Sequence, residues 1–289
     1  MTINLQMWSS ICLGALTVRS LLAIAAARHW SLCQMDVKNA FPNGDLTKEV
    51  YMQPPPSSLV PSTKTERGVL LLLLLYVNDM IITEDDIMGI SSLKKFLSRQ
   101  FEMKDLGLLS NFLGLEISYD SSGYFLTQAK YTSDLLVRAA LTNCKTTPTP
   151  IDPQTRLTPL DLLSDGTIYR QLAGNLIYLT IIRLDISDVV HIVSQFMAAP
   201  RSLHYDALIR ILYYLKGTMF HGLHYSAYSS IQLHTFSDAD WVGDPIDRRS
   251  TIGLCFFLGD CLISWRSKTQ TLVARSSTEA KYRAFADTT

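Results

Sequence analysis

The residues of this sequence that could carry out chemistry include four acids, which form two candidate pairs. Asp36 follows a predicted strand, and Asp79 lies beside Asn78 at the tip of a predicted hairpin. Asp238 lies at the end of another predicted strand, and Glu279 in the first turn of a predicted helix. Two-metal phosphoryl chemistry needs such carboxylates, because Mg²⁺ prefers hard oxygen ligands. Acids at strand and helix ends are also ordinary turn and cap residues, so spacing alone leaves both interpretations open.

The hairpin that carries Asn78 and Asp79 is predicted from residues 69–86, VLLLLLLYVNDMIITEDD. A continuous apolar run, a polar break and a second apolar run indicate a buried strand or a hairpin of two strands. The run is too short for a membrane span, which needs roughly 20 apolar residues. Asn followed by Asp is also plain turn chemistry.

Periodicity and breaker residues predict the other elements. Before residue 143 we expect helices at 17–29, 87–101 and 130–141, and strands at 32–35, 49–52, 112–119 and 124–127. A Pro- and Thr-rich segment at 143–165 is the best linker candidate. After it we expect helices at 169–179, 186–197 and 204–216, strands at 231–237, 251–258, 261–265 and 272–275, and a final helix capped by Ser277 or Thr278.

Four basic residues lie on or between the three middle helices: Arg183, Arg201, Arg210 and Lys216. Their spacing could serve a phosphate backbone. A solvated helix face is at least as good an interpretation.

Composition limits the class of protein. The chain has 289 residues, 47% of them hydrophobic and 18% charged, which is typical of a globular protein long enough for two domains. Its 26 basic and 26 acidic residues balance, so nucleic-acid binding would have to use local patches. The five cysteines include no CxxC pair, which favours free thiols. Neither a signal peptide nor a membrane helix is predicted, so we expect an intracellular protein.

A series of motifs follows one order along the chain. The first half carries QMDVKNAF (34–41), NGDL (43–46), EVYM (49–52), LYVNDMII (75–82) and FLGLEI (112–117). The second half carries YLKGT (214–218), SDADW (237–241), DRRST (247–251), LISW (262–265) and SSTEA (276–280). Together these motifs resemble the reverse transcriptase and RNase H region of copia-type LTR-retrotransposon Pol polyproteins. The resemblance covers nearly the whole chain after about Thr17.

The resemblance implies an α+β fold: a right-hand polymerase palm-like sheet with helices, a helical connection, then a truncated RNase H-like mixed α/β domain. The implied boundaries are 1–142 for the reverse transcriptase region, with a deletion near 57–68, and 143–168 for a linker. The helical connection, or thumb-like region, would be 169–225 and the RNase H-like domain 226–289.

The resemblance also implies activities, cofactor and partners. Asp36 and the Asn78–Asp79 position would bind two Mg²⁺ (or Mn²⁺) ions for RNA-directed DNA synthesis. Asp238 and Glu279 would bind metal for hydrolysis of RNA in an RNA–DNA hybrid. The partners would be an RNA template, a DNA primer, the hybrid and dNTPs, with no membrane. The expected location is a cytoplasmic virus-like particle or the nucleus.

Three departures from the family pattern predict impaired activity. Asn78 stands where the family has the first Asp of its pair, so one negative charge is lost. Segment 56–68 is too short to hold the family's next motif. The chain ends inside the helix that Glu279 begins, and Lys281 replaces a residue that is usually Glu.

We therefore expect an RNA-directed DNA polymerase with RNase H whose activity is impaired in this copy. One alternative is an inactive retroelement remnant. Another is a fragment that binds nucleic acid without catalysis, through the helices from Arg183 to Lys216 and through Arg248 and Arg249.

Overall fold

The computed structural model describes residues 5–37, 71–76, 78–84, 87–101, 103–152, 165–243 and 247–287. Over these ranges the chain is mixed α/β, with seven α-helices and three antiparallel sheets. It divides into two compact units, one of His29–Leu109 and one of Met1–Arg28 with Ser110–Thr289. The predicted strand 49–52 and the shortened segment 57–68 lie outside the described residues.

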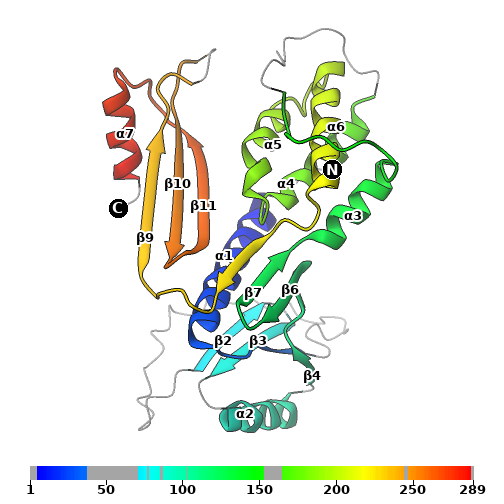
Figure 1. Cartoon of the computed structure of the whole chain (residues 1–289), viewed down its shortest axis with the longest axis vertical. Helices are drawn as coiled ribbons and strands as arrows, with labels where there is room; N and C mark the ends of the chain where they lie inside the picture. The colour runs from blue at the N-terminus through cyan, green and yellow to red at the C-terminus, as the bar shows by residue number, and fades with distance from the viewer. Residues whose placement is uncertain are drawn as a thin grey trace, which may run out of the picture. The chain divides into compact units, whose positions relative to one another are not determined.

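The smaller unit is a four-stranded antiparallel sheet with one helix on one face (Figure 1). The strands follow the order β2–β3–β1–β4. Their bounds are Cys33–Val37 (β1), Leu71–Tyr76 (β2), Asp79–Glu84 (β3) and Met103–Leu108 (β4), and the helix α2 spans Ile87–Gln100. Leu93 and Leu97 of α2 pack against a buried cluster of Met35, Met80 and Ile82.

Two outcomes of the sequence analysis concern this sheet. The predicted hairpin is confirmed as β2 and β3, in which Tyr76 is the register partner of Asp79. Strand β4 was not predicted, because MKDLGL shows no alternation and five of its six residues are exposed.

The larger unit begins with a long helix, α1 (Leu5–Arg28), which contacts two strands of one sheet and one strand of another. The first sheet has the order β5–β6–β7–β8, with bounds Asn111–Phe112, Leu115–Asp120, Gly123–Thr127 and Leu223–Ser226. Because no proline interrupts residues 5–16, α1 begins well before the predicted Thr17. Within the described ranges, no helix is both long enough and apolar enough to cross a bilayer.

A helical layer follows the first three strands of this sheet in sequence. Its elements are α3 (Ala129–Arg138), α4 (Thr167–Leu179), the 3₁₀ turn η1 (Leu184–Ile186), α5 (Ser187–Ser194) and α6 (Ser202–Gly217). They share one core, to which α4 contributes Tyr169 and Leu176 and α6 contributes Leu208 and Leu212. The predicted helices in this region are confirmed, although α5 ends three residues before the predicted residue 197.

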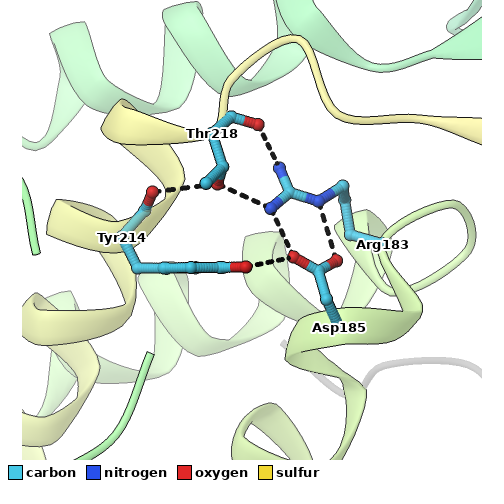
Figure 2. Close-up of polar contacts among 4 residues, drawn as sticks. All are labelled: Arg183, Asp185, Tyr214 and Thr218. Carbon is cyan, nitrogen blue, oxygen red and sulfur yellow. Dashed lines mark hydrogen bonds and ion pairs between the residues drawn. The ribbon is translucent and has the colours of Figure 1, made fainter. Parts of the chain in front are cut away.

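One ion-pair cluster ties η1 to the end of α6 (Figure 2). Arg183, which is 2% exposed, donates Nε and Nη2 to the two carboxylate oxygens of Asp185 at 2.9 and 2.6 Å. It also donates to the carbonyl and hydroxyl oxygens of Thr218 at 2.9 and 2.7 Å. The Tyr214 hydroxyl donates to Asp185 at 2.8 Å. Arg183 thus has a structural role in these contacts, and its contact with a phosphate backbone stays a prediction.

The last part of the chain is a three-stranded antiparallel sheet with a helix packed on it (Figure 1). The elements are β9 (Leu233–Ala239), β10 (Thr251–Leu258), β11 (Cys261–Thr269) and α7 (Ser277–Ala286), and the sheet order is β11–β10–β9. Ala280 and Ala284 are fully buried against the sheet. Their small side chains allow α7 to approach the sheet closely. The predicted strand 272–275 is wrong: these residues are irregular, with bends at Leu272 and Arg275, and pair with no described strand.

Replacing Arg183 with Met should lower the free energy of unfolding by about 2–3 kcal/mol, because Asp185 and Thr218 lose their donors. Urea denaturation followed by circular dichroism measures this. The matched control is Arg170→Met in α4, where the exposed Arg170 makes one 3.4 Å contact, to the Met197 carbonyl oxygen. An Arg183 variant as stable as the control would contradict the structural role.

The fall in the free energy of unfolding at acid pH should depend on Asp185. Burial alone would raise the pKa of this carboxyl, but the hydrogen bonds and charge of Arg183, with the bond from Tyr214, hold the pKa below its usual value. Between that lowered pKa and the unfolded value of about 3.9, the unfolded chain binds more protons, so stability falls as pH falls through this window.

Asp185→Asn should therefore flatten this fall in urea denaturation measured from about pH 5 downward. Asp188→Asn, a change at an exposed acid in α5, is the control and should leave the fall in place. Parallel curves for wild type and Asp185→Asn would contradict this assignment.

Candidate active site

Asp36 and Asp79 lie opposite each other in the sheet of the smaller unit. Their Cα atoms are register partners in the β1–β3 pairing. Side chains alternate along a strand, and the neighbouring Met35 and Met80 pack toward α2. The two acids therefore lie on the sheet face opposite α2. Asn78, in the turn before β3, joins them, so the structure brings together the three residues predicted for the first site.

Two side-chain amides donate hydrogen bonds to these acids. The Nδ2 of Asn78 donates to Oδ1 of Asp36 at 2.8 Å, and the Nε2 of Gln34 donates to Oδ1 of Asp79 at 3.1 Å. An ionised carboxylate is an acceptor only, so each amide must present its N–H group and not its oxygen. The backbone N–H of Val37 donates to the Asn78 carbonyl at 2.8 Å, which holds the turn against β1.

Gln34 was not singled out by the sequence analysis. It is 8% exposed and lies two residues before Asp36, hence on the same face of β1. That period-two spacing from a candidate acid is the signal that could have found it.

Glu279 lies at the start of α7, and both of its carboxylate oxygens are engaged. Oε2 accepts the backbone N–H of Arg275 at 2.8 Å, and Oε1 accepts from Nη2 of Arg283 at 2.7 Å. The Arg275 N–H first, and then the Arg283 side chain, hold the pKa of Glu279 below its usual value. The helix cap is Ser276, which accepts the Glu279 N–H at 3.1 Å, and not the predicted Ser277 or Thr278.

Asp238 lies in β9, next to the sheet's contact with α7. Its Oδ1 accepts the backbone N–H of Ala239 at 2.9 Å and lies 3.2 Å from Nζ of Lys281. The Ala239 N–H and then the Lys281 ammonium hold the pKa of Asp238 below its usual value. Lys281 is thus the close partner of Asp238 in the second predicted site.

The donor sets of both sites argue against a divalent cation. Mg²⁺ needs lone pairs on hard oxygens, but an N–H group holds Oδ1 of Asp36, N–H groups hold both oxygens of Glu279, and an ammonium lies beside Oδ1 of Asp238. In the part of the chain that the structure describes, no three His, Cys, Asp or Glu residues gather as a metal site would require. As arranged, these residues do not fit the ion that the family resemblance implies.

The basic residues predicted to contact nucleic acid divide into two kinds. Lys216, like Arg183, is used inside the fold, because its Nζ donates to the Cys144 carbonyl at 2.6 Å. Arg210 contacts the Thr149 hydroxyl at 3.1 Å and Asp152 at 3.9 Å. Arg201 is the N-cap residue before α6, and its backbone N–H donates to Nδ1 of His204.

Arg248 and Arg249 are exposed in the segment before β10. Arg249 forms an ion pair of 3.4 Å with Asp247, and both partners of this pair are more than 40% exposed. Such a pair is weak in water, so Arg249 can meet a ligand at little cost.

Comparison with known proteins identifies the family of the chain. A family model described as reverse transcriptase (RNA-dependent DNA polymerase) matches residues 7–68 and 62–153, two pieces that meet in the shortened segment. The retrovirus-related Pol polyprotein from transposon RE1 of Arabidopsis thaliana is 36% identical over 319 residues, which cover 94% of this chain. That from transposon TNT 1-94 of Nicotiana tabacum is 31% identical over 94% of this chain. No solved structure matches.

The chain spans 22% of the RE1 polyprotein and 25% of the TNT 1-94 polyprotein. An uncharacterized mitochondrial protein of Arabidopsis thaliana is 43% identical and is matched over 90% of its length. The family model covers about half of the chain, and the Pol relatives cover nearly all of it. The chain therefore belongs to the reverse transcriptase family of copia-type retrotransposon Pol polyproteins.

Proposed function

We propose that this chain derives from an RNA-directed DNA polymerase with RNase H, and that its polymerase centre is impaired in this copy. The observation that carries the proposal is the register pair Asp36–Asp79 with Asn78 at the adjoining turn. The acids lie on the sheet face opposite α2, and both are partly exposed. This arrangement supports a palm-like role for the sheet β2–β3–β1–β4.

The impairment follows from charge. Two-metal phosphoryl transfer depends on anionic ligands that hold both ions near the phosphates. Asn78 offers an amide where a carboxylate is expected, and in this structure the amide N–H is bonded to Asp36. The centre therefore lacks one negative charge, and a side-chain donor contacts each of the two carboxylates that remain.

The second half of the proposal concerns an RNase H-like region in residues 226–289. Its support is a three-stranded antiparallel sheet followed by α7, with Asp238 in β9 and Glu279 in the first turn of that helix. The proposed partners are an RNA template, a DNA primer, an RNA–DNA hybrid and dNTPs. An intracellular location, in virus-like particles or the nucleus, belongs to the same proposal.

A second candidate function is nucleic-acid binding without catalysis. Arg248 and Arg249 favour it, because both are exposed and surface guanidinium groups can neutralise phosphates. Binding of this kind weakens steeply as salt rises, which separates it from aggregation.

Primer extension on a poly(rA)–oligo(dT) template with Mg²⁺ tests the polymerase proposal. The wild-type chain should extend the primer by no more than about one hundredth of the rate of an intact reverse transcriptase. Asn78→Asp should raise the rate by at least roughly tenfold, because it restores a carboxylate. The matched control is Asn111→Asp, the same change at an exposed site in β5, which should not raise it.

Wild-type extension at the rate of the intact enzyme would overturn the impairment. Extension by Asn78→Asp that survives a further Asp79→Asn change would show that the synthesis does not come from this centre.

Electrophoretic shift of an RNA–DNA hybrid tests the binding candidate. Changing Arg248 and Arg249 together to Gln should weaken the shift several-fold at low salt, because two phosphate contacts are lost. A double variant that binds as tightly as wild type would exclude this segment as the contact.

A further inference from the structure

We propose that internal donors close both acidic sites of this chain, so that neither site takes up a divalent cation. Asn78 and Gln34 are the donors at Asp36 and Asp79, and Lys281 and Arg283 are the donors at Asp238 and Glu279. The proposal deepens the proposed function, because it says what replaces the ion in each centre. It also concerns folding, since a site closed in this way is complete without metal.

The first site depends on the direction of two amides. Asn78 and Gln34 both turn N–H toward a carboxylate, at 2.8 and 3.1 Å. For the Asn78 oxygen to become a metal ligand, its amide would have to rotate, which breaks the bond to Asp36. The cation would then gain one neutral oxygen ligand, but the protein would lose the hydrogen bond between Asn78 and Asp36. This loss weakens cation binding.

The position of Gln34 strengthens this point. Gln34 is 8% exposed, and β1 lies between β3 and β4, so its backbone is fixed beside Asp79. It donates to the same carboxylate that a cation shared with Asp36 would need. Each acid of the pair therefore already has a partner supplied by the chain.

In the second site, positively charged side chains oppose the binding of a cation. Lys281 carries its ammonium to within 3.2 Å of Asp238, where it neutralises the acid and repels a divalent ion. The contact is solvent-exposed, with side chains 62% and 75% accessible, so screening limits its strength. Glu279 is less available to a cation than Asp238, because a backbone N–H and Arg283 each donate to one of its two oxygens.

A titration with Mn²⁺, followed by the electron paramagnetic resonance signal of the free ion, tests the proposal on the whole EDTA-treated chain. The wild type should bind Mn²⁺ more weakly than a Kd of about 1 mM at these sites. Asn78→Asp should tighten binding by at least roughly tenfold, and Lys281→Glu by several-fold, because each exchanges a blocking donor for a carboxylate.

Two matched controls accompany these variants. Asn111→Asp adds a carboxylate at an exposed position in β5. Lys268→Glu makes the same charge change as Lys281→Glu in another exposed ion pair, with Asp287 at 3.4 Å. Both should bind Mn²⁺ as weakly as wild type does.

Asn78→Ala separates the two possible roles of Asn78 even if Asn78→Asp folds poorly. If the amide blocks the site, removing it leaves Mn²⁺ binding equal or tighter. If the amide oxygen is a ligand, removing it weakens binding, and that result would overturn the proposal. Sub-millimolar binding by wild type that Asp36→Asn or Asp238→Asn abolishes would overturn it as well. None of these readouts needs polymerase activity, so primer extension can fail or succeed independently.

Discussion

The antiparallel pairing of β1 with β3 is the constraint on which the candidate site depends. In the observed register Met35 and Met80 pack under α2, so Asp36 and Asp79 must point to the opposite face. A slip of one residue would turn the acids toward α2 and the methionines away from it. The apolar packing of the sheet therefore fixes the position of the polar pair, whether or not the pair still performs chemistry.

This dependence explains how a polymerase-derived sheet can persist with an altered centre. The packing of α2 on β1 and β3 needs neither a metal nor a substrate. The neighbouring carboxylates of Asp36 and Asp79 still need hydrogen-bond donors. Asn78 and Gln34 each supply one N–H group. A single change from a carboxylate to an amide removes charge repulsion and supplies a donor. In the larger unit, Lys281 brings the corresponding positive charge to Asp238.

Much of the fold follows from sequence patterns, because its helices and hairpins are local. The apolar runs around Asn78 predicted β2 and β3, and the helix predicted at 204–216 lies within α6. Strand β4 escaped prediction because its pairing with β1, and not its own pattern, makes it a strand. The roles of Gln34 and Arg183 also escaped, since each depends on a partner far away in sequence, Asp79 for one and Thr218 for the other.

The most direct measurement is a crystal structure of the wild-type chain soaked in Mn²⁺, with anomalous scattering recorded at the manganese edge. Internal closure predicts no manganese peak beside Asp36 and Asp79 or beside Asp238 and Glu279. It also predicts that the Asn78 amide stays within hydrogen-bond distance of Asp36. A manganese ion coordinated by Asp36 and Asp79, with the Asn78 amide turned to offer its oxygen, would contradict it.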